Sequence, residues 1–404
     1  MTVRAASGRQ IGISGAAVAV AGALTSALGY LVPVIGARGL DAADLGALAT
    51  VLAIAAIASV PGTGLQIAVA VHRARHPEAA AGRAGLLTAA LCAGVVVLLA
   101  PIAGPLLDLP LAVVLLLAVQ TFTVVAAGRR LGELQGAGRF LRLAAGMTVL
   151  AAGRYGGLIA GLLLGAGLTG SMLIGALGSL LIPPALALLA RRPAAHDGPR
   201  ITARQIVTAC SATLAMLIVS YADLILARHL LPAADSGAYA VGTVLTKGAL
   251  WAPQVVTVLA LPRLAQGSRR ALTVAAALVA GCGAVLILAS AVAGELAFRL
   301  AGGPDYVSLA GYAPVFAATG ACYALVFVLV NAQVAAGARW PSAPLWAATV
   351  LLVVTAEWIV PHTFTAIMWC ALGAALLALA GTAAATVVSK VWIRTSAGGR
   401  RSLG

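Results

Sequence analysis

The feature that most constrains this chain is a series of apolar segments, each long enough to cross a lipid bilayer. A membrane-spanning helix needs about 20 predominantly apolar residues. Twelve segments meet this requirement, at residues 11–35, 43–71, 82–105, 109–128, 144–167, 170–190, 205–227, 236–261, 271–294, 307–335, 342–361 and 364–389. Only 9% of the 404 residues are charged, whereas a soluble domain carries about 25%. The sequence therefore predicts an all-α polytopic membrane protein with about 12 transmembrane helices.

The positions of the basic residues predict how these helices are oriented. Cytoplasmic loops of membrane proteins carry an excess of Lys and Arg. With the N-terminus inside, 21 of the 26 basic residues fall on the inner side, three fall on the outer side (Arg38, Arg228 and Arg299), and two fall within spans (Arg154 and Lys247). We therefore expect both termini in the cytoplasm. The Ala, Gly and Arg bias is typical of a GC-rich bacterial genome, so the expected location is a bacterial cytoplasmic membrane. The net charge of +15 reflects this topology and does not indicate a nucleic-acid partner.

An internal repeat divides the chain into two halves. The loop between the first two spans, residues 38–49, matches the loop between spans 7 and 8, residues 229–240, without gaps at an offset of 191. The matched pairs include Leu40/Leu231, Asp44/Asp235 and Gly46/Gly237. Because each half has an even number of spans, the halves share one orientation and are related by an axis along the membrane normal. We therefore predict two six-helix bundles, at residues 1–190 and 205–404, joined by a cytoplasmic linker at residues 191–204.

Three stretches carry motifs beyond hydropathy. They are Asp44-Leu-Gly46; Glu133-Leu-Gln135-Gly-Ala-Gly138-Arg139-Phe140; and the block from Asp223-Leu-Ile-Leu-Ala-Arg228 through Asp235-Ser-Gly237-Ala-Tyr239 to Pro253 and Leu261-Pro262-Arg263-Leu264. Together they resemble the MOP (multidrug/oligosaccharidyl-lipid/polysaccharide) superfamily of exporters, and within it the polysaccharide-type flippases. The resemblance extends over the whole chain. It implies a MATE-like fold, in which two bundles enclose a central cavity that opens alternately to each side.

Two charged residues in the middle of spans are the main candidates for substrate binding. Ionisable residues in the hydrocarbon region are energetically costly and usually functional. Arg154 lies about 15 Å into the fifth span and Lys247 about 16 Å into the eighth. One cation in each half would suit a diphosphate head group, because arginine binds phosphate oxygens in pairs and lysine acts as a point charge. The plainer interpretation is that each side chain snorkels or bonds to a nearby carbonyl.

Other polar residues within the spans are weaker candidates. Asp223, near the outer end of the seventh span, is a candidate counter-ion to Lys247 or a coupling site for protons or sodium, and an interfacial pair with Arg228 is the simpler interpretation. Asn331 and Gln333 are candidate cavity contacts, although hydrogen bonds between helices are the preferred interpretation. Four prolines are expected to kink spans and to serve as hinges: Pro33, Pro61, Pro253 and Pro262.

These features predict a flippase that exports a polyprenyl-diphosphate-linked oligosaccharide. The expected partners are this lipid-linked glycan, membrane lipid and the machinery of polysaccharide synthesis. A peptidoglycan-precursor flippase is a narrower version of the same prediction. The main alternative is a multidrug/cation antiporter of the same superfamily, which would need acids deep in the spans. A membrane-embedded glycosyltransferase or polymerase has less support, because the five histidines lie in loops or at span ends. The five cysteines lie singly in apolar stretches, so neither a metal nor a cofactor is expected.

Overall fold

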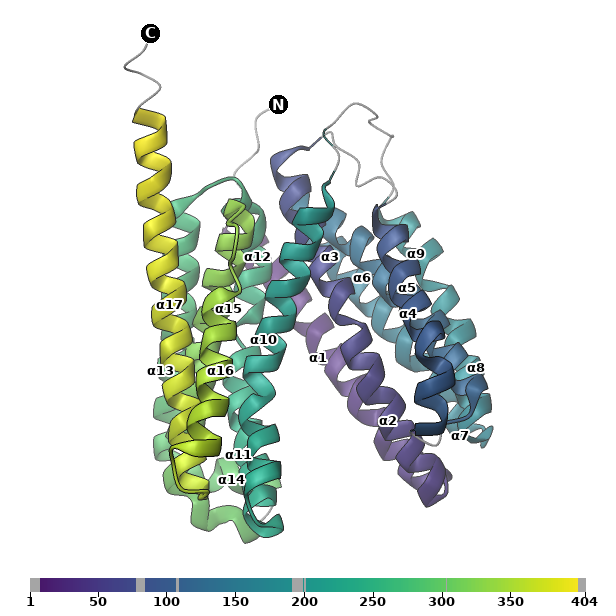
Figure 1. Ribbon diagram of the computed structural model, residues 1–404. Helices are drawn as coiled ribbons and strands as arrows, with labels where there is room; N and C mark the ends of the chain where they lie inside the picture. The colour runs from purple at the N-terminus through teal and green to yellow at the C-terminus, as the bar shows by residue number, and fades with distance from the viewer. Residues whose placement is uncertain are drawn as a thin grey trace. The chain divides into compact units, whose positions relative to one another are not determined.

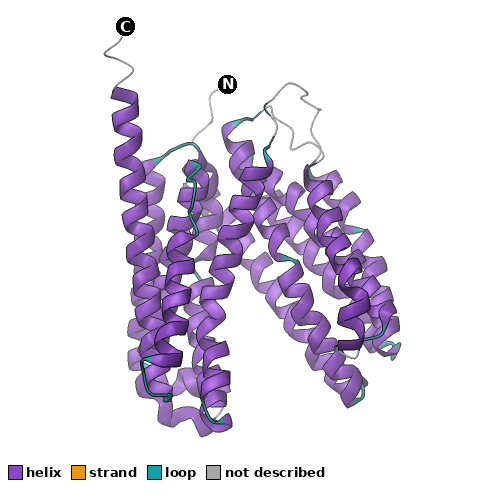
Figure 2. Ribbon diagram, in the orientation of Figure 1, coloured by secondary structure: helices purple, strands orange, loops and turns teal. Residues whose placement is uncertain are grey.

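Every regular element in the described part of the chain is a helix (Figure 2). The computed structural model describes residues 8–77, 84–106, 109–190, 199, 201–302 and 304–398. Within these residues, 11 helical stretches are long and apolar enough to cross a membrane. The predicted span 342–361 corresponds to α16 (Ala343–Trp358), which is apolar but only 16 residues long. Its helix measures about 24 Å, shorter than the hydrocarbon core of about 30 Å. The protein is therefore a multi-pass, all-helical membrane protein, as predicted.

The chain forms two compact units, Met1–Cys210 and Ser211–Gly404, and each is described by itself. The division falls within α10 (Ala203–Leu230). Most of the predicted linker 191–204 lies outside the described residues. The proposed bundle boundaries at residues 190 and 205 stay a prediction.

Unit 1 is built around the central helix α5 (Figure 1). Its elements in order are α1 (Gly8–Gly39), α2 (Ala42–Ala58), α3 (Val60–Arg75), α4 (Ala84–Leu106), α5 (Leu111–Gly136), α6 (Phe140–Ala151), η1 (Ala152–Gly156), α7 (Gly157–Leu163), α8 (Gly167–Leu180) and α9 (Ile182–Leu189). The core between α1, α2, α5, α7 and α8 is aliphatic and includes Val32, Leu48, Leu117, Leu158 and Met172. Since lipid covers the outside, many large apolar side chains remain exposed.

Unit 2 has α15 in the corresponding central place. After α10 its elements are α11 (Ala233–Trp251), α12 (Gln254–Ala265), α13 (Arg269–Val292), α14 (Gly294–Gly302), η2 (Pro304–Tyr312), α15 (Ala313–Ala336), α16 and α17 (Phe364–Gly398). Its core contains a cluster of aromatic rings contributed by Tyr239, Phe298, Phe316 and Phe364. The helices α5 and α15 correspond to the fourth span of each predicted half, which agrees with the internal repeat.

Two spans are interrupted where the sequence places a proline. The span Asp44–Arg75 divides into α2 and α3 at Ser59, two residues before Pro61, and the span Asp235–Ala265 divides at Ala252, directly before Pro253. Proline lacks the amide hydrogen that a helix needs and its ring clashes with the preceding turn. The two predicted breaks are confirmed. By contrast, α1 continues through Pro33 and α12 continues through Pro262.

Helices α3 and α5 approach at nearly backbone contact along a row of glycines, Gly128, Gly132 and Gly136. A Cβ atom on Gly132 would lie only 2.5 Å from the carbonyl oxygen of Gln66. The Gln66 side chain also donates a hydrogen bond of 2.9 Å to Gln135 across this contact. Small residues are the usual means of close helix association in membranes. The row of glycines therefore fixes α3 against the central helix.

Replacing Gly132 by alanine should destabilise the protein by about 1–3 kcal/mol, because the added methyl group cannot fit without separating α3 from α5. The measurement is the thermal unfolding temperature of the purified protein in detergent. Gly94 in α4 is the matched control, because nothing lies within 4 Å of a Cβ atom built there. Gly94→Ala should leave stability unchanged or raise it by about 0.5–1 kcal/mol. Equal unfolding temperatures for the two variants would contradict the close contact.

Candidate functional site

The side chain of Lys247 crosses from α11 to α10. Its Nζ donates a hydrogen bond to the carbonyl oxygen of Ser220, and it lies 3.4 Å from the centroid of the Tyr221 ring. The residue is about 18 Å along the span that begins at Asp235. An ammonium group over an aromatic face is stabilised by the ring quadrupole, more strongly where water is excluded. The structure thus gives this intramembrane cation a defined position in the seam between α10 and α11.

Asp223 lies one helical turn from Ser220 on α10 and is only 2% exposed. Its Oδ2 accepts a hydrogen bond of 3.2 Å from the hydroxyl of Tyr239 on α11. The ring of Tyr239 is fixed in turn by edge contacts with Phe316 and Phe364, with centroids 5.4 and 5.5 Å away. The charge of Lys247 also acts on the Asp223 carboxylate, without a direct ion pair. Asp223, Tyr239 and Lys247 therefore form one polar cluster inside unit 2.

The interfacial pair between Asp223 and Arg228 is not formed. Helix α10 continues to Leu230, so Asp223 lies about 10 Å from its end, deeper than the sequence suggested. Residues five apart on a helix differ by about 140° in direction, so the two side chains face different surroundings. Arg228 is exposed, whereas Asp223 is buried against α11. Of the two cations predicted near Asp223, it is therefore Lys247 whose charge acts on the carboxylate.

Arg154 lies in η1, a single turn of π-helix within the span Phe140–Leu163. It is about 14 Å from Leu163 and about 21 Å from Phe140 along the helix. Its guanidinium carbon is 5.1 Å from the centroid of the Tyr155 ring. That ring lies across Gly29 of α1, where an added Cβ atom would be 3.5 Å from the Tyr155 hydroxyl. Among the described residues, Arg154 has neither a hydrogen bond nor an ion pair.

The π-turn is held in place by glycines that face α8. A Cβ atom on Gly157 would lie 2.5 Å from the carbonyl oxygen of Ile174, and one on Gly161 would lie 2.5 Å from the Cα atom of Ser171. This close approach packs α7 against α8 directly after the π-turn that contains Arg154. Single π-turns occur often at functional sites because the extra residue redirects neighbouring side chains. The local structure is thus consistent with Arg154 being positioned for a ligand.

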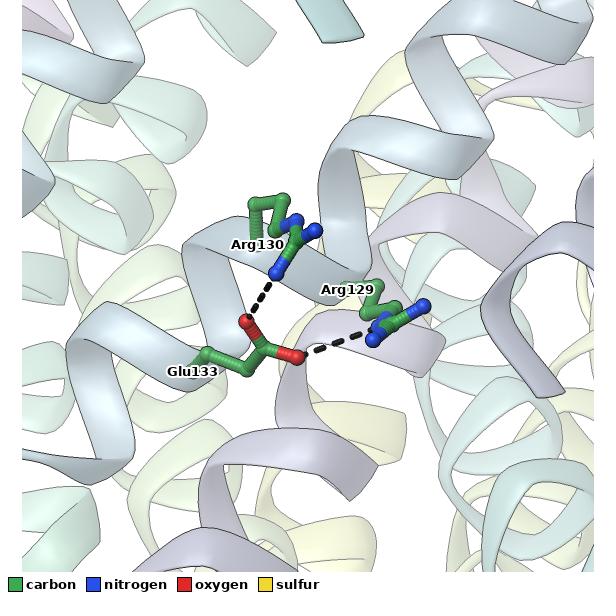
Figure 3. A network of polar contacts seen from close by, with 3 residues as sticks. All are labelled: Arg129, Arg130 and Glu133. Carbon is green, nitrogen blue, oxygen red and sulfur yellow. Dashed lines mark hydrogen bonds and ion pairs between the residues drawn. The ribbon is translucent and has the colours of Figure 1, made fainter. Parts of the chain in front are cut away.

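A second polar network lies near the end of α5, where Glu133 accepts hydrogen bonds from Arg129 and Arg130 at 3.1 and 2.9 Å (Figure 3). All three side chains are partly exposed, and such pairs contribute at most about 1 kcal/mol. Because two cations already occupy this carboxylate, the network is a poor candidate for ion coupling. Among the described residues, Asp223 is thus the one acid that lies deep within a span.

Asn331 and Gln333 are engaged in contacts within unit 2. Gln333 donates hydrogen bonds to the Thr382 carbonyl oxygen and to Thr386 Oγ1 on α17, at 2.8 and 2.9 Å. Asn331 donates to the Phe327 carbonyl oxygen of its own helix at 2.8 Å. Both residues are buried. The preferred interpretation of Gln333, a bond between helices, agrees with this geometry, whereas Asn331 bonds within α15.

Replacing Gln333 by leucine should lower the stability of unit 2. A hydrogen bond between helices in a membrane contributes about 0.6 kcal/mol on average and up to about 1.7 kcal/mol. With both bonds lost, we expect a fall of about 1–3 kcal/mol, measured by thermal unfolding in detergent. An unfolding temperature equal to that of the wild type would contradict the two bonds between α15 and α17.

Sequence reasoning missed the two tyrosines of the cluster in unit 2. Tyr221 and Tyr239 were not assigned to a site, although the chain has only seven tyrosines and 5% aromatic residues. Tyr221 lies two residues before Asp223, and Tyr239 belongs to the repeated loop 229–240. A rule that pairs scarce aromatic residues with intramembrane charges would have found both. Which charge each one contacts depends on the rotation of α10 against α11, which the sequence does not specify.

Comparison with known proteins identifies the fold. No protein-family model matches the sequence, and no curated protein does. Three solved structures of transporters are similar over 93–94% of this chain and 95–96% of their own, at 14–16% sequence identity. They are a MATE transporter variant from Vibrio cholerae (TM-score 0.72), a eukaryotic MATE transporter (0.69) and a MOP superfamily transporter from Pyrococcus furiosus (0.68). The likeness confirms the predicted MATE-like fold.

Proposed function

We propose that this protein is an exporter that carries an anionic, lipid-linked saccharide from the inner to the outer leaflet. Arg154 binds the diphosphate of the head group, and Lys247 is a second candidate cation for an anionic cargo. The lipid tail stays in the bilayer throughout. The similarity to MATE and MOP superfamily transporters supports export as the general activity. The choice of an anionic cargo rests on the charges within the spans.

The observation that supports this proposal most is that Arg154 has neither a hydrogen bond nor an ion pair among the described residues. An arginine in the middle of a span normally pairs with an acid or a carbonyl. Among the described residues Arg154 has neither, and only the ring of Tyr155 lies against it. A guanidinium group offers paired donors that match the oxygens of a phosphate. A diphosphate would therefore supply the counter-charge that the helix bundle does not.

The direction of export needs no coupled ion in this scheme. The cytoplasmic side of a bacterial membrane is electrically negative, so an anion moving outward releases about 2.3 kcal/mol per charge per 100 mV. One of the similar solved structures, the Pyrococcus furiosus transporter, is described as having a binding pocket of reversed polarity that suggests a different function.

A second candidate function, an ion-coupled multidrug antiporter, is favoured by the cluster in unit 2. Asp223 is a buried carboxylate with a hydroxyl donor, Tyr239, and a nearby cation, Lys247. Such a group can exchange a proton or a cation during a transport cycle. Several of the similar solved structures are MATE transporters, one of them described as a multidrug resistance transporter. In this case Asp223, and not Arg154, would be essential.

Reconstituted protein separates the two candidates. Proteoliposomes would receive either a fluorescent polyprenyl diphosphate saccharide or the cationic dye ethidium, with and without a membrane potential or a pH gradient. We expect the protein to accelerate movement of the lipid diphosphate, and the potential to increase its rate. Ethidium should cross no faster than through empty vesicles. Acceleration of ethidium alone, driven by a pH gradient, would replace the flippase with the antiporter.

A further inference from the structure

A groove of about 630 Å³ opens on the surface of unit 2, where α10 ends and α11 begins. Its lining includes Leu224, Arg228 and His229 of α10 and Ser236, Gly237 and Ala240 of α11. A volume of this size is within the range of small-molecule sites, about 300–1,000 Å³. The predicted topology places this end of unit 2 at the outer face of the membrane. None of the residues assigned above to substrate binding lines this groove.

The groove combines one unpaired cation with apolar walls. Arg228 is exposed and has neither a hydrogen bond nor an ion pair among the described residues. The neighbouring His229 is 72% exposed and only approaches Glu357, at 3.9 Å. Ile225, which is 66% exposed, adds to the apolar wall formed by Leu224. At Gly237 nothing lies within 4 Å of an added Cβ atom, so the floor of the groove is open.

The groove lies on the same two helices, α10 and α11, that hold Lys247. On α11, Ser236, Ala240 and Lys247 follow one another at intervals of four and seven residues, which places them on one helix face. On α10, Tyr221 and Arg228 are likewise seven residues apart. Lys247 contacts Ser220 and Tyr221, so the seam between α10 and α11 extends from the groove down to this cation. Arg228 lies about 10 Å further out than Tyr221.

We infer that this groove is an outward-side subsite for the diphosphate and first isoprenyl carbons of the lipid-linked substrate. Arg228 binds the phosphates, His229 contributes a second donor, and the apolar wall contacts the lipid chain. This inference rests on the proposed function and adds a second binding site for the diphosphate to it. The diphosphate moves along one seam from the level of Lys247 to that of Arg228, and the saccharide projects past Gly237.

Binding of farnesyl diphosphate to the purified full-length protein in detergent tests the site directly. Isothermal titration calorimetry should show that Arg228→Gln weakens binding about tenfold, the loss of one charge-assisted contact. Gly237→Leu, which fills the groove and removes no charge, should weaken binding by a similar factor. Arg299→Gln is the matched control, because Arg299 is exposed on α14 of the same unit and does not line the groove.

Three results would overturn the subsite. Equal losses for Arg228→Gln and Arg299→Gln would mean that the ligand responds to surface charge in general. Equal binding of farnesol would mean that the groove selects the chain and not the phosphates. Complete displacement of farnesyl diphosphate by phosphatidylglycerol at equal concentration would assign the groove to bulk anionic lipid.

Transport measurements distinguish failure of the subsite from failure of the proposed function. If Arg154 variants stop movement of a polyprenyl diphosphate saccharide but Arg228→Gln and Gly237→Leu do not, the function stands and the subsite is wrong. If wild-type protein binds farnesyl diphosphate through Arg228 but moves no lipid diphosphate, the site stands and the function is wrong. If the inference is correct, both groove variants slow transport about tenfold.

Discussion

If the protein carries a lipid diphosphate as proposed, replacing Arg154 by glutamine should reduce its transport rate by about ten- to a hundredfold. The estimate follows from the loss of a hydrogen-bonded charge, about 1.5–3 kcal/mol, with about 1.4 kcal/mol corresponding to each factor of ten. Glutamine keeps a similar length and polar donors, so the change isolates the charge. The measurement is the initial rate of movement in proteoliposomes. Arg154→Lys should retain part of the rate, because a point charge remains without the paired geometry.

The stability of the same variant distinguishes a binding role from a structural one. Since Arg154 has no carboxylate partner among the residues that the structure describes, removing its charge relieves the cost of holding a cation within the membrane. We therefore expect Arg154→Gln to unfold at the same temperature as the wild type or at a higher one. Tyr155→Phe is a matched control that keeps the ring beneath the guanidinium group and should leave the rate nearly unchanged. A lower unfolding temperature together with slow transport would indicate a structural arginine.

Single replacements of Asp223 and Lys247 should destabilise the protein more than the double replacement does. Removing one member of a buried charge pair leaves the other uncompensated, which costs about 3–5 kcal/mol when both are fully buried. Lys247 is only partly buried, so we expect about 2–3 kcal/mol for Asp223→Asn. The double variant Asp223→Asn/Lys247→Met should recover much of this loss. Thermal unfolding of all four proteins completes a double-mutant cycle, and strictly additive effects would exclude coupling.

The same variants also discriminate between the two candidate functions. If transport of the lipid diphosphate is driven by the membrane potential, Asp223→Asn should retain activity per folded molecule. If the protein is an ion-coupled antiporter, Asp223→Asn should abolish coupled transport even where stability is recovered. A Tyr239→Phe variant removes the hydroxyl donor to Asp223 and keeps the aromatic packing. If the protein is an antiporter, Tyr239→Phe should impair coupled transport as Asp223→Asn does. If it is a flippase, Tyr239→Phe should remain active.

Much of the fold could be predicted because membrane-spanning helices depend on a local property, the length of an apolar run. Prolines likewise act locally, so the breaks near Pro61 and Pro253 followed from the sequence. At Pro33 the helix α1 continues without a break, and the predicted kink there stays a prediction. The shortness of α16 was also not predicted, because the residues after Trp358 are apolar enough to extend the segment without being helical.

The candidate sites were less predictable because they depend on contacts between helices. Arg154 and Lys247 were found by their charge alone, but neither the π-turn around Arg154 nor the glycine contacts that follow it were predicted. Asp223 was judged too shallow because α10 extends to Leu230. Tyr239 could be connected to Asp223 only after the rotation of α11 was known.

The row of glycines between α3 and α5 has a mechanical consequence for any transport cycle. Because the contact at Gly132 has no room for a methyl group, α3 cannot slide along α5 past larger side chains without first separating from it. The other part of the same span, α2, is held by larger side chains such as Leu48 and Val51, which can exchange rotamers as they move. We therefore expect α3 and α5 to move together as one rigid body. Helix α2 should move relative to them, with Ser59 as the hinge.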